Sequence, residues 1–504
     1  MIRISISGKI VLSILIALFC IRGSAQSPPV NPYVSNRNNK TFVPDYSISK
    51  DDLLSDIDMY IEKIDKVHPD PYRLISKNDF ISEINKIKSK IQLLSNDNLN
   101  IFDCYYYLQR IAVLIKDGHT KIYNPRNWDK LISSFFPLNI KILEGRAFIN
   151  QNFGDNKIPL KVEILSINKI NVKDIFTEML KYCEGTLHEY KLARLEEELR
   201  YYLHTFYKFK SPWKLEYVFN GKKKKVLIEG INHKLLVEKN RKNRWFSQSS
   251  IKNGNEEIPI FKLPHLGYRK KDFKPVIDKF FKNNFDKKKI VFDLRGCPGG
   301  NGLRTYDVVD HLLDLPYSIS KKFMYRVSKA LKDYIKYYIQ DYLFARKKPI
   351  SQWRNILYKS GIWNDEYDEM YKIVLNSGLN TFARVQNISH IPDKKTPKYK
   401  GNIFILVDHR SFSAAVVFAS VFKHYKLAKI VGRETGGRID FFSDTISIEL
   451  PNSKLISKIP TALMTLQGDK AERGIIPDRI VRYTINDFLN ENDPDIETIK
   501  NVKK

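Results

Sequence analysis

The chain has 504 residues, of which 43% are hydrophobic, and a formal net charge of +29. This length suits two or three domains with cores of their own, and four cysteines are too few for a scaffold held by disulfides. The charge would suit an anionic partner, but the basic residues are spread along the chain. They come with no zinc-finger, helix-turn-helix or RNA-binding motif, which argues against a nucleic-acid-binding protein.

Residues 1–25 have the pattern of a secretory signal peptide. A basic start precedes an apolar run over 10–19, and small residues at 23–25 form a cleavage site before Gln26. We therefore predict export to the periplasm or the outside of the cell. A lipoprotein signal through Cys20 is a weaker alternative, because a bulky residue precedes it. No later segment has about 18 uninterrupted apolar residues, so no membrane span is predicted.

Residues 26–46 are polar and rich in Pro and Asn, and are predicted to be a linker. A helical N-terminal domain is predicted over 47–130. Ser49 and Asp52 form a capping box, and apolar residues follow them at helical spacing. Two more helices are indicated near 80–87 and over 107–115.

His119 follows the third predicted helix in a tight turn that begins Asp117-Gly118. Such a turn holds an imidazole in a defined place, as a general base requires. A lone histidine is more often structural than catalytic, and the chain has ten of them. Position alone therefore leaves both roles open.

Residues 137–232 mix strands and helices. Strand, turn and helix follow one another over 163–176, helical residues fill roughly 174–206, and a hairpin is predicted across Asn220-Gly221. The polar residues 233–257 are predicted to be a second linker.

An α/β pattern of alternating strands and helices begins at residue 258 and continues to 485. A Tyr-rich stretch over 303–380 is predicted to be a helical insertion, and 486–504 a tail. The predicted fold class is therefore α/β, within an α+β multidomain chain.

A glycine-rich turn follows the predicted strand 289–294 and contains Gly299 and Gly300. It could bind phosphate, but it has neither GxGxxG nor GxxxxGK[ST], and Pro298 removes one N–H donor. It could instead aim backbone N–H groups at a developing oxyanion.

Ser413 stands at the mouth of a predicted helix, 414–425, after a buried strand over 402–407. Its hydroxyl lies at the N-terminal end of the helix, where the electrostatic potential favours negative charge, and beside the free N–H of Ala414. These are the parts of a nucleophile with half an oxyanion hole, although an ordinary helix cap has the same pattern.

Five motifs in order resemble the carboxyl-terminal processing protease family of serine peptidases, nearest its tricorn-core and interphotoreceptor-retinoid-binding-protein-like branch. They are Asp117-Gly-His-Thr120, Asp293-Leu-Arg-Gly-Cys-Pro-Gly-Gly300, Ser411-Phe-Ser-Ala-Ala415, Gly432-Arg-Glu-Thr-Gly-Gly437 and Glu472-Arg-Gly-Ile-Ile-Pro-Asp478. The resemblance is strong over 258–485, fair over 45–125 and weak over 137–232, where a PDZ-like segment is suggested.

The resemblance implies that Ser413 is the nucleophile. The processing branch has a lysine 25 positions later, where this chain has Arg438, and arginine cannot be deprotonated to act as a base. The tricorn-like branch uses a histidine, which matches His119, and an acid that matches Glu472, 59 positions after the serine. That branch also has a serine before its histidine, where this chain has Gly118.

The predicted function is that of a secreted serine endopeptidase with a Ser-His-Glu site. The oxyanion hole would be formed by Gly299, Gly300 and Ala414. The expected partner is a protein or peptide substrate, no metal or organic cofactor is expected, and the oligomeric state is not predicted. One alternative is a non-catalytic ligand- or peptide-binding protein on the same fold; another is a cationic surface-binding protein.

Overall fold

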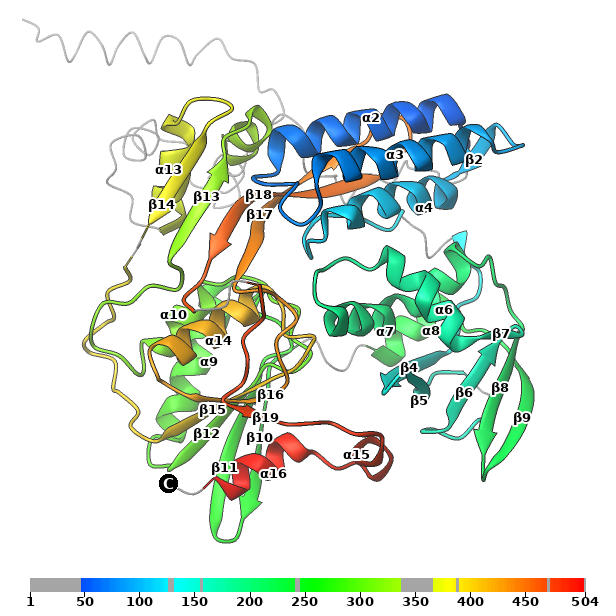
Figure 1. Ribbon diagram of the computed structural model, residues 1–504. Helices are drawn as coiled ribbons and strands as arrows, with labels where there is room; N and C mark the ends of the chain where they lie inside the picture. Colours follow the sequence, from blue (N-terminus) through cyan, green and yellow to red (C-terminus); the bar gives the residue numbers. More distant parts are fainter. Residues whose placement is uncertain are drawn as a thin grey trace, which may run out of the picture.

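The computed structural model of the chain describes residues 47–502, except for 126–130, 155–156, 241–244, 337–365, 387–388 and 469–471. The predicted signal peptide and the linker over 26–46 lie outside the described residues. Figure 1 shows three parts: N-terminal helices, a mixed middle part, and a larger C-terminal part that carries two sheets. No helix among the described residues is both long and apolar enough to cross a membrane.

The N-terminal part is helical, as predicted. Its helices are α2 (Lys50–Val67), α3 (Lys77–Gln92) and α4 (Ile101–Ala112), with a short 3₁₀ turn at Val113–Ile115. The capping box is confirmed, because the Ser49 side chain accepts a hydrogen bond from the N–H of Asp52. The strands β1 (Ser47–Ser49) and β2 (Asn98–Asn100) pair beside these helices.

The middle part contains an antiparallel sheet with helices packed on it. The sheet has the order β4-β5-β6-β8-β9, with β7 beside β6. These strands are β4 (Leu138–Leu143), β5 (Arg146–Asn152), β6 (Glu163–Ile167), β7 (Ile170–Asn171), β8 (Trp213–Phe219) and β9 (Lys222–Ile228). The predicted hairpin is confirmed as β8 and β9. The helical stretch is divided into α6 (Val172–Met179) and α7 (His188–Thr205), because Gly185 between them has a φ of 111°.

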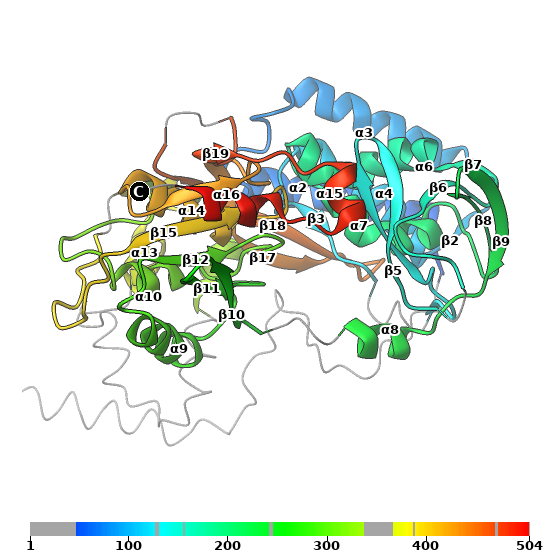
Figure 2. The ribbon, with the colours of Figure 1, turned by 90° about the horizontal axis from the view of Figure 1, so that it is seen from below.

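The C-terminal part is built on a sheet of order β10-β11-β12-β15-β16-β19. Its strands are β10 (Ser247–Asn253), β11 (Glu256–Lys262), β12 (Lys289–Asp293), β15 (Asn402–Val407), β16 (Lys429–Gly432) and β19 (Arg479–Ile480). From β11 onward neighbouring strands are parallel. Helices α9 (Lys270–Asn283) and α14 (Ala414–His424) pack on one face, and α16 (Pro494–Asn501) packs on the other (Figures 1 and 2).

Two segments predicted to be linker and tail are part of the folded structure instead. The predicted linker 233–257 contains α8 (His233–Asn240), which packs against the middle part. It also contains β10, an edge strand of the C-terminal sheet whose exposed side chains explain its polar composition. The predicted tail contains α15 (Ile485–Asn490) and α16, which buries Ile496 and Ile499 against the sheet. A short amphipathic helix has few apolar residues, so its sequence resembles that of a tail.

The predicted helical insertion over 303–380 is not helical throughout. Besides α10 (Arg304–Val309) and α13 (Glu366–Asn376) it contains β13 (Lys322–Arg326), which pairs with β14 (Phe382–Gln386). Aromatic residues are common in strands as well as in helices. Residues 322–326 form a strand because they pair with β18. Residues 337–365 lie outside the described part.

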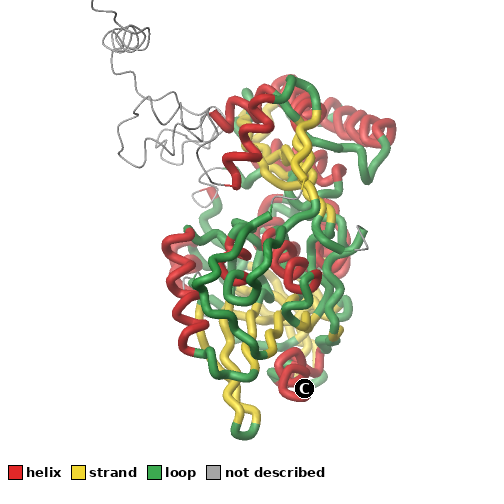
Figure 3. Tube along the Cα trace, turned by 90° about the vertical axis from the view of Figure 1, so that its left-hand side faces the viewer, coloured by secondary structure: helices red, strands yellow, loops and turns green. Residues whose placement is uncertain are grey.

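A second sheet joins the N-terminal helices to the C-terminal part. Its order is β14-β13-β18-β17, with β17 (Asp440–Glu449) and β18 (Ile456–Thr465), and it stands above the larger sheet in Figure 3. The short strand β3 (Lys121–Ile122), which follows the predicted His119 turn, pairs antiparallel with β18. This pairing fixes the His119 turn to the C-terminal part.

Candidate active site

The two loops of the predicted site meet at one edge of the larger sheet. Strands β12 and β15 are parallel neighbours, with Asp293 paired to Leu406, so the turns after them leave the same edge. The hydroxyl of Ser411 donates to the carbonyl of Leu294 at 2.8 Å, and the N–H of Phe412 donates to that of Cys297 at 3.0 Å. These bonds lock the glycine-rich turn against the Ser413 turn.

Ser413 has a strained backbone at the start of α14, with φ 55° and ψ −119°. A non-glycine residue adopts such angles only where its surroundings impose them, which is common at functional sites. Its side chain makes no capping hydrogen bond, so the interpretation of Ser413 as an ordinary helix cap is wrong. The hydroxyl instead lines a cavity of about 410 Å³.

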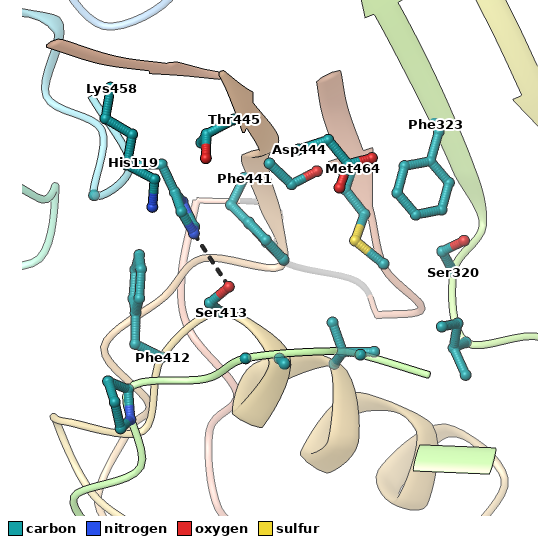
Figure 4. A pocket seen from close by; sticks show the side chains of 18 of the residues that line it. His119, Ser320, Phe323, Phe412, Ser413, Phe441, Asp444, Thr445, Lys458 and Met464 are labelled. Atoms are coloured by element: carbon teal, nitrogen blue, oxygen red, sulfur yellow. Dashed lines mark hydrogen bonds between the residues drawn. The ribbon is translucent and has the colours of Figure 1, made fainter. Parts of the chain in front are cut away.

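His119 reaches Ser413 from the N-terminal part of the chain. Its Nε2 lies 3.1 Å from the Ser413 hydroxyl, although the two residues are 294 positions apart (Figure 4). The Asp117 carboxylate holds the turn by accepting the N–H groups of His119, at 2.6 Å, and Thr120, at 2.9 Å. The imidazole packs against the rings of Phe412 and Phe441, with centroid separations of 4.9 and 5.8 Å.

The environment of His119 favours a neutral ring. Burial, followed by the nearby charge of Lys458, lowers the pKa of His119 from 6.5 to about 3. Lys458 is itself affected, because burial and the charge of Lys121 lower its pKa from 10.5 to about 8. A neutral imidazole in hydrogen-bond contact with a hydroxyl can accept its proton, which is what a general base must do.

The other nitrogen of His119, Nδ1, is buried and has no hydrogen bond among the described residues. The Asp117 carboxylate lies 3.9 Å from it. Burial acts to raise the pKa of Asp117, but contacts with His68, His119 and Thr120 hold it below its usual value. Asp117 therefore stays ionised beside the imidazole.

Glu472 does not meet His119 as predicted. It is exposed, and within the described part of the chain it forms no hydrogen bond or ion pair with His119. The tricorn-like branch has a serine where this chain has Gly118. A side chain at Gly118 would collide with the ring of Phe412. Arg438 pairs with Asp440 at 3.3 Å and is absent from the residues that line the Ser413 cavity.

The predicted oxyanion residues lie beside the serine. A side chain at Gly299 would come within 2.7 Å of the Ser413 Cβ, so only glycine permits this approach. Gly299 and Gly300 have φ values of 100° and 141°, which also require glycine. Within the described residues, the backbone N–H groups of Gly300 and Ala414 donate no hydrogen bond to another backbone carbonyl. Both residues line the cavity.

Sequence reasoning missed the residues that other parts of the chain bring to the site. Tyr190, on α7 of the middle part, stacks on Phe412 at 4.5 Å between ring centroids and lines the cavity. Lys458 reaches the cavity from β18. Neither lies in a recognisable motif, and only the packing of the three parts brings them to Ser413.

Comparisons with known proteins agree with this geometry. The profile of peptidase family S41 matches residues 257–497. The structure of mature CPAF in complex with lactacystin is 15% identical, with 90% of this chain and 98% of that chain covered and a TM-score of 0.62. A CPAF point mutant is 14% identical, with 90% and 99% covered and a TM-score of 0.64.

At these identities the two structures show a shared fold. No curated protein matches the chain. The family match covers the glycine-rich turn and Ser413, and the shared fold extends to the N-terminal part that carries His119. The chain is therefore a serine-type peptidase, and its residues 257–497 match the profile of peptidase family S41.

Proposed function

We propose that the chain is an exported endopeptidase that works through an acyl-enzyme on Ser413, with His119 as its general base. The observation that carries this proposal is the 3.1 Å contact between a neutral, buried imidazole and the hydroxyl of a strained serine. Export rests on the sequence of residues 1–25 alone.

In the first step the Ser413 oxygen attacks the peptide carbonyl while His119 Nε2 takes the hydroxyl proton. The carbonyl oxygen becomes an oxyanion, and we assign its donors to the N–H of Ala414 and to the turn at Gly299 and Gly300. The imidazolium then protonates the departing amine. In the second step His119 deprotonates a water molecule, which releases the acyl group and restores the serine.

A third residue, besides Ser413 and His119, holds the imidazole in its orientation. Asp117 holds the His119 backbone and lies 3.9 Å from Nδ1, which supports it as the positioning residue. The motif resemblance supports Glu472 in the same role.

Labelling with a fluorophosphonate probe tests the nucleophile without knowledge of the substrate. The wild-type protein should be labelled and the Ser413→Ala variant should not. His119→Ala should slow labelling by several orders of magnitude, since loss of one member of a triad costs about 10⁴-fold in well-studied proteases. Arg438→Ala is the matched control and should label at a near-normal rate.

A peptide-library digestion then tests endopeptidase activity. Internal cleavage that disappears in Ser413→Ala supports the proposal. A wild-type protein that is neither labelled nor active would favour the alternative, a ligand- or peptide-binding protein on the same fold.

A further inference from the structure

The cavity at Ser413 has two chemically different sides. His119 and Lys458 lie on one side of the serine (Figure 4). The opposite side is walled mainly by apolar side chains from the C-terminal part: Leu303, Ile319, Phe323, Val417 and Met464. Asp444 brings a carboxylate to this cavity, and in Figure 4 it lies between Thr445 and Met464, toward Phe323 and away from Lys458.

A local distortion of strand β17 turns Asp444 into the cavity. Side chains alternate between the two faces of a strand, and Phe441, Ser443 and Thr445 line the cavity at this spacing. Asp444 would face away in a regular strand. Its φ of 49° interrupts the pairing of β17 with β18, so that it lines the cavity with its neighbours. Such irregularities often re-aim a side chain next to an active site.

No cation of the described residues pairs with the Asp444 carboxylate. It accepts one short hydrogen bond from the hydroxyl of Tyr325 and forms no ion pair among the described residues. Burial raises its pKa, as expected for a carboxylate that is partly removed from water. A carboxylate in an apolar wall is costly until a cation pairs with it.

The stereochemistry of the reaction identifies which residue of the substrate enters this side. His119 must protonate the departing amine, so the amine side of the scissile bond lies toward His119. The residue that supplies the carbonyl lies on the other side of Ser413, next to the apolar wall. A lysine or arginine there could lay its methylene groups along this wall and bring its charge to Asp444.

We propose that the peptidase selects lysine or arginine on the carbonyl side of the scissile bond, with Asp444 pairing with the cation. This inference rests on the proposed function of Ser413. Lys458 adds to the selection, because it forms no ion pair among the described residues and repels a cationic side chain from the His119 side. The charges on the two sides of the cavity therefore orient a basic substrate residue.

The test compares two fluorogenic peptides that differ only at the carbonyl-side residue, lysine in one and norleucine in the other. The wild-type protein should prefer lysine in kcat/KM. Asp444→Asn keeps the size of the side chain and should lower kcat/KM for lysine by roughly thirtyfold or more, as expected when one partner of a buried charge pair is removed. The norleucine peptide should be cleaved at nearly the wild-type rate.

Tyr325→Phe is the control for a structural role of Asp444. It removes the tyrosine hydroxyl and leaves the carboxylate, so the preference for lysine should persist. If Asp444 only anchors Tyr325, both variants will change both substrates equally, and the inference is wrong.

A wild-type preference for norleucine that Asp444→Asn leaves unchanged would also overturn the inference, while cleavage itself would uphold the proposed function. Failure of both peptides, together with an unlabelled Ser413, would instead overturn the proposed function.

Discussion

The strained backbone of Ser413 predicts that the nucleophile position is more stable as glycine than as alanine. Angles of φ 55° and ψ −119° cost a non-glycine residue about 1–3 kcal/mol, and alanine keeps this cost. Glycine removes it but adds about 0.5–1 kcal/mol of unfolded-state entropy. Both variants lose the hydrogen bond to His119, so the difference between them isolates the backbone. Ser413→Gly should therefore be about 1 kcal/mol more stable than Ser413→Ala.

Ser420, in the middle of the same helix, provides a matched control. Its hydroxyl donates to the carbonyl of Gln467 at 2.8 Å, so both of its variants also lose one hydrogen bond. In a regular helix glycine is about 1 kcal/mol less stable than alanine, so the order of the two variants should reverse at Ser420. Urea denaturation midpoints of the four variants measure both differences. If glycine is less stable than alanine at Ser413 as well, the backbone there is not strained.

Two further predictions concern His119. With a pKa of about 3, the imidazole should remain an active base in mildly acidic solution, and kcat/KM should fall only as pH drops through that pKa. Lys458→Met removes a charge that disfavours the imidazolium, so it should move this acid limb to higher pH; a limb that stays in place would contradict the role of Lys458. Asp117→Asn should lower kcat strongly and Glu472→Gln only slightly, because Asp117 alone of the two contacts His119 in this structure. The reverse order of effects would restore Glu472 as the third member of the site.

Local signals in the sequence predicted much of the fold. The capping box at Ser49 and the hairpin at Asn220-Gly221 depend on residues close together in the chain, and both were confirmed. The loop after β12 and the turn at Ser413 could also be placed together, because parallel neighbouring strands bring their ends to one edge. His119 was found through its motif and its order relative to the serine.

Features that depend on packing between distant segments were not predictable. Polar strand β10 resembled a linker, since only its pairing with β11 shows that it is a strand. Tyr190 and Lys458 reach the cavity only after the middle part and β18 are in place. The low pKa of His119 has the same origin, because burial and a distant lysine replace the aqueous surroundings that set the ordinary value near 6.5.

Because strand β3 has only two residues, the protein can lose its activity before it unfolds. It pairs with β18 through Lys121 and Ile122, the N–H of Tyr123 adds one hydrogen bond to the carbonyl of Ile456, and the strand closely follows His119, the proposed base. Elements with few bonds open at a lower free energy than the whole protein does. A brief opening of this junction would carry the imidazole away from the serine while the surrounding helices and sheets stay folded. Activity therefore depends on the contact between the His119 turn and the part of the chain that carries Ser413. We expect mild heat or denaturant to abolish turnover reversibly before the chain unfolds.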